Sequence, residues 1–304
     1  MVRVAIGAQL CESWLMDQKT LDFYAAPGRF TTLEKSFTSG DIDEVVDVVQ
    51  GLLVYDLAAE SLYGVKLSAT QSDAIHERDT ARLLDVVRAI DPRPLNEPRP
   101  AAERVGARCH AFSRLTVALL RAAGVPARAR CGFGGYFQPG YFEDHWVAEY
   151  WNATAARWQM ADAQLDAKWR TMIGFTGDPL SITTTEFVTA GHAWQSWRGG
   201  ELDASRCGLF GIGEHGPHWI AGNLRLDLAS LNKVEMLPWD VWGAGWAPGG
   251  QPTDAQLDLF DSVAALTVNP DERFGELRSR YETDDSLRMD GTIFNVVRGQ
   301  VETL

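Results

Sequence analysis

Three residues of the sequence, Cys109, His145 and Asp162, have side chains that together could carry out acyl transfer. A cysteine attacks a carbonyl carbon as its thiolate, and a helix N-terminus or a neighbouring cation favours that anion. A histidine must then exchange the proton, and an acid or amide must orient the imidazole. The sequence supplies these groups in the order thiol, imidazole, carboxylate.

Cys109 lies in the stretch "RVGARCHAF", at the point where an apolar helical pattern begins. The spacing of Phe112, Leu115 and Leu119 predicts a helix from Cys109 to Gly124. Cys109 would then stand at the helix N-terminus, where unpaired N–H groups and the helix dipole favour an anion. The same N–H groups could receive a developing oxyanion.

His145 and Asp162 are expected at neighbouring strand ends. Strand-like runs cover 127–133, 145–151 and 157–162, and the turn "NATAA" joins the last two. His145 opens the second run and Asp162 closes the third, so the two side chains could touch. A helix followed by an antiparallel meander indicates an α+β fold and not repeated βαβ units.

The chain order of these elements resembles the transglutaminase-like superfamily, in particular a bacterial branch of it. The resemblance covers about 104–166 and rests on the cysteine at the helix start, "GVPAR", "DHWVAEYW" and the final "W…D". It implies a papain-like core in which the catalytic helix packs on an antiparallel sheet. It also implies Cys109 as nucleophile, His145 as general base and Asp162 as the orienting acid.

Two family features do not transfer directly. Many members have an acidic or aromatic residue after the catalytic cysteine, whereas this chain has His110. The helical pattern turns His110 to a different face from Cys109, so it is assigned no role. The superfamily also implies a second oxyanion donor upstream of the cysteine, which the motifs here do not identify.

Simpler roles compete for each of these residues. Cys109 could be a small buried packing residue, or a metal ligand together with His110, His145 and Asp162. The local spacing of common zinc sites is missing for that set. Asp166 competes with Asp162 for the orienting role.

Glu149 is either a group supporting His145 or a structural carboxylate, and we expect Arg128 and Arg130 to pair with acidic residues. Three residues are candidates for contacting a substrate: Trp146, Trp219 and His218. Packing is the competing role for both tryptophans, and a polar Gly-Pro turn is the competing setting for His218. Six late tryptophans could line a cleft or simply fasten the C-terminal part to the core: Trp194, Trp197, Trp219, Trp239, Trp242 and Trp246.

The chain is expected to have three parts within one compact unit. Residues 1–100 form a helical N-terminal part, 101–170 the transglutaminase-like core, and 171–304 a Trp-rich extension that completes or covers the cleft. Helices are predicted over 39–64, 72–90 and 253–267, within 223–237 and in part of 271–294. The proline-rich stretch 91–100 predicts a stiff connector.

Composition limits the possible partners and compartment. The formal net charge of −13 disfavours nucleic acid and anionic membrane surfaces. Cys11, Cys109, Cys131 and Cys207 are too few for a disulfide scaffold, and packing is expected for all but Cys109. No apolar run reaches the roughly 18 residues of a membrane span, and the first residues lack a signal-peptide pattern. A cytoplasmic protein is therefore expected.

Taken together, these patterns predict cysteine-dependent acyl transfer on a peptide, amide or acyl-thioester substrate. Hydrolysis by a peptidase or amidase is favoured, because water needs no dedicated site. An amide-forming acyltransferase and a non-catalytic binding protein on the same fold are the alternatives. The chemistry requires no organic cofactor and no metal ion, and the sequence does not indicate an oligomeric state.

Overall fold

The computed structural model describes residues 17–33 and 39–304. The fold is mixed α+β, as predicted. The helices are α1 (Gln18–Ala25), α2 (Ile42–Leu52), α3 (Ala59–Tyr63), α4 (Ala69–Asp73), α5 (Thr80–Ile90), α6 (Cys109–Ala122), α7 (Ala167–Ile173), α8 (Ala190–Arg198), α9 (Pro217–Leu231), α10 (Asp254–Thr267) and α11 (Phe274–Thr283). The strands are β1 (Leu53–Tyr55), β2 (Val105–Ala107), β3 (Ala127–Gln138), β4 (Tyr141–Asn152), β5 (Arg157–Ala161), β6 (Phe187–Thr189), β7 (Cys207–Leu209), β8 (Glu214–His215), β9 (Asp240–Val241), β10 (Thr292–Asn295) and β11 (Gln300–Thr303).

A six-stranded sheet forms the centre of the molecule. Its order is β6-β3-β4-β7-β8, and β5 also pairs with β4. The long β3–β4 hairpin and the β4–β5 hairpin are antiparallel, as the predicted meander requires. β7 adds to the start of β4 in parallel, through Phe142 and Glu143. The central strand β4 therefore carries neighbours along its whole length.

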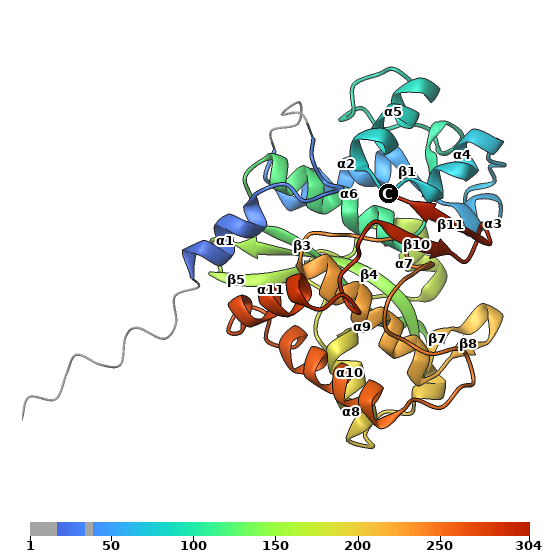
Figure 1. Ribbon diagram of the computed structural model, residues 1–304. Helices are drawn as coiled ribbons and strands as arrows, with labels where there is room; N and C mark the ends of the chain where they lie inside the picture. Colours follow the sequence, from blue (N-terminus) through green and yellow to red (C-terminus); the bar gives the residue numbers. More distant parts are fainter. Residues whose placement is uncertain (1–16, 34–38) are drawn as a thin grey trace, which may run out of the picture.

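Helices cover both faces of this sheet (Figure 1). α6 packs on β3 and β4 and is covered in turn by α2. α9 packs on β3 from the other side, with α8 and α10 behind it. The predicted catalytic helix thus packs on an antiparallel sheet.

The helix predicted over 39–64 is interrupted by a strand at 53–55, but helical structure resumes in the 3₁₀ helix η1 (Asp56–Ala58) and in α3, whose C-cap is Gly64. Asp41 caps α2 by accepting the N–H groups of Asp43 and Glu44, but the helix ends at Leu52. Leu53–Tyr55 then form β1, which pairs in parallel with β2. Such pairing between distant segments is invisible in a local pattern, although Val and Tyr favour strands.

Two further predicted helices are shorter than expected. The stretch 72–90 contains the end of α4, the short 3₁₀ helix η2 (Ala74–His76) and α5, whose start is capped by Asp79. The stretch 271–294 contains α11 and the beginning of β10. An N-cap side chain that accepts hydrogen bonds from backbone N–H groups starts a new helix. Hydrophobic periodicity alone does not show this boundary and predicts one continuous helix.

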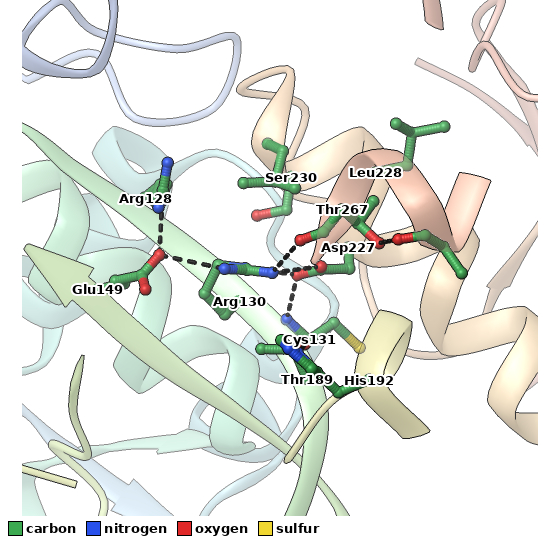
Figure 2. A network of polar contacts seen from close by, with 12 residues as sticks. Arg128, Arg130, Cys131, Glu149, Thr189, His192, Asp227, Leu228, Ser230 and Thr267 are labelled. Carbon is green, nitrogen blue, oxygen red and sulfur yellow. Dashed lines mark hydrogen bonds and ion pairs between the residues drawn. The ribbon is translucent and has the colours of Figure 1, made fainter. Parts of the chain in front are cut away.

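A buried ion network joins the sheet to α9 (Figure 2). Asp227 on α9 accepts hydrogen bonds from Arg130 at 3.0 and 2.9 Å and from the Cys131 backbone N–H at 2.9 Å. Glu149 on β4 accepts from Arg128 at 2.5 Å and from Arg130 at 3.2 Å. The two arginines thus pair with acidic residues as predicted, and Glu149 is a structural carboxylate.

Residues outside the described ranges include Cys11 and most of the N-terminal stretch in which no signal peptide was recognised. Within the described ranges, no helix has the length and apolar character needed to cross a membrane.

Candidate active site

Cys109 is the first residue of α6. β2 leads directly into this helix, and the N-cap residue Arg108 provides no side-chain cap. Among the described residues, no side chain caps the first turn of α6. The Ala111 N–H donates to the backbone carbonyl of Arg108. Cys109 is 8% exposed, so its thiol lies at the edge of the core and not deep within it.

His145 and Asp162 are in contact. His145 Nε2 lies 2.8 Å from Asp162 Oδ2. β4 and β5 bring them together, because Ala148 pairs with Ala161 and Asp162 directly follows β5. The side chains are only 2% and 1% exposed, so solvent screens this pair weakly.

The charge state of His145 follows from its two partners. Burial opposes protonation, but the Asp162 carboxylate and a hydrogen bond and charge from Cys109 outweigh it and raise the pKa of His145 to about 10. Since Nε2 is engaged by Asp162, the remaining nitrogen Nδ1 is the one available to Cys109. The imidazole is therefore positioned as a cation between a carboxylate and a thiol.

Asp162 is held by four hydrogen bonds. Besides His145, its Oδ2 accepts the Tyr136 hydroxyl at 2.7 Å. Its Oδ1 accepts the Gln164 backbone N–H at 3.0 Å, and its own N–H donates to the Pro179 carbonyl at 2.7 Å. These bonds fix the carboxylate that orients the imidazole.

An irregularity in β3 places two aromatic rings over His145. The register with β4 shifts between Gly134 and Gln138, so more residues of β3 than of β4 occupy this interval. The Phe137 and Tyr136 rings lie 4.7 and 6.0 Å from the His145 ring. Bulges of this kind often direct side chains toward functional sites. Here they shield the imidazole from water.

Tyr55 is a site neighbour that the sequence did not reveal. It ends β1 and pairs with Ala107, two residues before Cys109. Burial, followed by the charge of Cys109, raises the pKa of its hydroxyl, which stays protonated. Tyr55 was placed inside a predicted helix, and only the β1–β2 pairing brings it here. Arg108 lies over the same ring and binds Asp56.

Asp166, the competing acid, has a different task. Its carboxylate caps α7 by accepting the N–H groups of Lys168 and Trp169, both at 2.9 Å. It also accepts the Tyr63 hydroxyl at 2.7 Å. The geometry thus brings Asp162, and not Asp166, to His145.

The three substrate-contact candidates lie in different settings. Trp146 is buried in the main core, and strand alternation directs it away from the side of His145. Trp219 on α9 donates its indole N–H to Asp144, the residue before His145. His218 lies beside Trp219, with ring centroids 6.3 Å apart. Burial favours packing for Trp146. Asp144 shares the strand face of Trp146 and not that of His145, so its contact with Trp219 does not bring Trp219 or the neighbouring His218 to the imidazole.

Two further features are the other described cysteines and a surface groove. Cys131 and Cys207 are free and fully buried, as packing cysteines should be. A groove of about 1040 Å³ runs between α2 and the proline-rich connector and includes Asp166 but none of the three proposed catalytic residues. Chemistry, and not cavity size, therefore singles out the Cys109 site.

Comparison with known proteins identifies a family match over part of the chain. Residues 82–163 match the family model of the transglutaminase-like superfamily, and this segment contains Cys109, His145 and Asp162. A crystal structure of a candidate cysteine protease from Cytophaga hutchinsonii is similar at 16% identity and a TM-score of 0.24, over 49% of this chain and 48% of that one. The chain thus aligns with about half the length of that protein. None of the curated proteins matches the sequence.

The mixed fold and the family match support a cysteine enzyme in general. More particularly, residues 82–163 carry a transglutaminase-like core, which confirms the resemblance recognised in the sequence motifs.

Proposed function

We propose that the protein is a cysteine-dependent acyl-transfer enzyme acting on an amide or thioester, with hydrolysis as its main reaction. The observation that carries the proposal is the His145 imidazole, which has Asp162 Oδ2 at 2.8 Å on one nitrogen and Cys109 available to the other. This is the arrangement that nucleophilic catalysis by a thiol requires.

The reaction has two halves. Cys109 Sγ attacks the carbonyl carbon, His145 gives its proton to the departing amine or thiol, and a thioester to Cys109 remains. Water then attacks the thioester while His145 takes up the water proton and returns it to the thiolate, and a carboxylic acid leaves. Asp162 keeps the imidazole oriented through both halves and stabilises its cation.

Oxyanion stabilisation comes from two sides. The N–H groups at the start of α6 have no side-chain cap, and we assign them the role of receiving the carbonyl oxygen as it becomes negative. Tyr55 keeps a protonated hydroxyl close to Cys109, and we assign it the role of the second donor. A Tyr55→Phe variant should slow acylation by about 10²–10³-fold without loss of fold. A matched Tyr63→Phe variant, whose hydroxyl bonds to Asp166, should keep its acylation rate.

An activated acyl thioester tests the proposal directly. Wild-type protein should release the thiol and carry one acyl group at Cys109, visible by intact mass, whereas Cys109→Ala should do neither. An unchanged circular dichroism spectrum would show that the variant still folds. Full thiol release by Cys109→Ala would overturn the proposal.

Adding a primary amine separates hydrolysis from amide formation. Hydrolysis predicts that the free acid remains the main product at millimolar amine. A predominant amide product would identify an acyltransferase instead, and binding without an acyl adduct would identify a non-catalytic protein.

A further inference from the structure

Behind Cys109, one face of α6 carries three buried polar side chains with incomplete hydrogen bonding. His110, Ser113 and Arg114 share a face because they are three and four residues apart. They are 2%, 2% and 1% exposed. Among the described residues, neither nitrogen of His110, the Ser113 hydroxyl, nor Nε and Nη1 of Arg114 has a hydrogen-bond partner.

Arg114 is a buried charge without a paired carboxylate among the described residues. Its Nη2 donates to the Glu77 carbonyl at 2.5 Å. In residues 17–33 and 39–304, no carboxylate lies within 4.0 Å of its guanidinium. Burial lowers the pKa of Arg114 only to about 10, so the group is still charged at neutral pH. A buried, unpaired cation is costly, and water can complete its hydrogen bonds without neutralising it.

The acidic residues nearby already serve other groups. Glu235 pairs with Arg121 at 2.8 Å. Asp240 and Glu302 both pair with Arg78, at 2.6 and 2.8 Å. Glu235 Oε2 has no hydrogen-bond partner among the described residues, but neither oxygen of Glu235 lies within 4.0 Å of the Arg114 guanidinium.

Two more unpartnered groups face the same place from other elements. The Trp239 ring lies edge-on to His76 of η2 and to His110, with centroids 5.5 and 5.4 Å apart. His76 Nδ1 and Trp239 Nε1 are both buried, and neither has a partner within the described ranges. Burial, Arg114 and Arg108 hold the pKa of His110 well below its usual range, which reflects the positive surroundings.

A hollow of about 630 Å³ borders this cluster at His76. Its lining carries both charges: Arg29, Arg78, Arg82 and Arg298 lie there with Glu77, Asp79 and Glu302. The arginines of this lining provide positive charge on the His76 side of the cluster.

We propose that the Arg114 cluster, defined as His76, His110, Ser113, Arg114 and Trp239, binds one small inorganic anion of the size and charge of chloride. Arg114 supplies the opposite charge, and the neighbouring N–H and O–H groups donate hydrogen bonds to the ion. A metal ion is unsuited to the cluster, because it would meet the guanidinium and no carboxylate.

Thermal unfolding at constant ionic strength tests this site, with sodium gluconate replaced stepwise by sodium chloride or sodium bromide. The Tm of the wild-type protein should rise in a saturable manner, by roughly 5 °C at about a hundred times Kd. Arg114→Met should lose the saturable rise. Arg225→Met should keep it. Arg225, a residue of α9, is also buried, but its guanidinium lies over the Trp242 ring and it is not part of the Arg114 cluster. A flat wild-type response, or a saturable rise retained in Arg114→Met, would overturn the proposal.

Crystals of the wild-type protein soaked in bromide give a second readout that does not depend on a variant that folds. An anomalous peak should lie against the Arg114 guanidinium. Bromide at saturating concentration without a peak there would contradict the site.

Discussion

The His145 imidazole has Asp162 Oδ2 at 2.8 Å from Nε2, and our proposal gives its other nitrogen to Cys109. Asp162 alone would make His145 a buried ion pair of the kind that many proteins carry. In the proposed mechanism, Cys109 at the second nitrogen makes this pair a proton relay, because the thiol proton and the imidazole proton become exchangeable. The residue-scale predictions test these two contacts separately.

The stability of the fold should depend on pH through His145. The folded pKa is about 10 against 6.5 for the free side chain, owing to Asp162 and Cys109. Below pH 6.5 the imidazole is protonated in folded and unfolded chains alike, so the stabilisation is fully present. Between pH 6.5 and 10 the unfolded chain loses the proton first, and the stabilisation is progressively lost. Urea unfolding across this range should show a smaller decline for His145→Gln than for the wild type, and equal declines would refute the assignment.

Removing the carboxylate that orients His145 should be far more damaging than removing its hydroxyl neighbour. Asp162→Asn should lower kcat by about 10³–10⁴-fold, because the amide cannot stabilise the imidazolium. Tyr136→Phe should cost no more than about ten-fold, since the His145–Asp162 contact remains. Asp166→Asn is the matched control and should retain activity on the acyl thioester. Equal losses for Asp162→Asn and Asp166→Asn would show that the orienting acid is misassigned.

At this scale, the sequence indicated the residues whose chemistry is distinctive. Cys109, His145 and Asp162 could be singled out from chain order, and the structure brings His145 and Asp162 into contact. Tyr55 and Tyr136 could not be found this way. They reach the site through a parallel strand pair and through a bulge, and neither leaves a periodic signal.

Among the secondary-structure elements, β3 and β6 approach each other closely next to His145. Gly132, opposite His145 in the β3–β4 ladder, also pairs with β6. A Cβ there would lie 2.2 Å from the Val188 carbonyl oxygen and 2.8 Å from Thr189 Cα. Because these are backbone atoms, they cannot move aside cheaply.

Gly132→Ala should therefore destabilise the fold by about 1–3 kcal/mol, the cost of overpacking a core. At Gly135 the nearest atom to an added Cβ is Phe142 Cε1 at 3.5 Å, an ordinary contact. Gly135→Ala should thus change stability by less than about 0.5 kcal/mol. Chemical denaturation of the two variants checks the difference, and similar stabilities would contradict the close approach of β6.

Local periodicity predicted some elements well and others poorly, for physical reasons. α6 and β5 were predicted close to their observed bounds. β3 continues to Gln138 and β4 begins at Tyr141, so His145 lies within β4 and does not open it as predicted. The sequence pattern assigned 53–55 to a helix, because three strand residues hardly change the hydrophobic periodicity of a much longer helical stretch. Its partner β2 lies about fifty residues away, beyond the reach of any local pattern.

On the scale of the molecule, one core runs through all parts of the chain. The same apolar cluster includes Val45 before the site, Leu119 and Trp146 around it, and Trp194 and Phe260 behind it. Several late tryptophans fasten the C-terminal segment to this core, Trp194 among them through Phe260 and Trp246. Trp239 instead lies beside His110, close to the start of α6. The C-terminal part thus supports the catalytic helix as well as the sheet.

The ion pair between Arg130 and Asp227 should be the polar link that matters most to this arrangement (Figure 2). Asp227→Asn leaves the buried Arg130 with Glu149, at 3.2 Å, as its one remaining carboxylate among the described residues, so we expect a loss of about 3–5 kcal/mol. The control is Asp285→Asn, which breaks an exposed pair with Arg288 and should cost about 0–1 kcal/mol. Equal effects in urea unfolding would show that Asp227 does not hold α9 to the sheet.

The most direct test of the central claim is the alkylation rate of each cysteine at neutral pH, followed by peptide mass spectrometry with iodoacetamide. We predict that Cys109 reacts at least about ten times faster than Cys131 and Cys207, and that His145→Gln removes this advantage. A Cys109 that reacts no faster than the two buried cysteines, or that is indifferent to His145, would contradict a thiol activated by the imidazole.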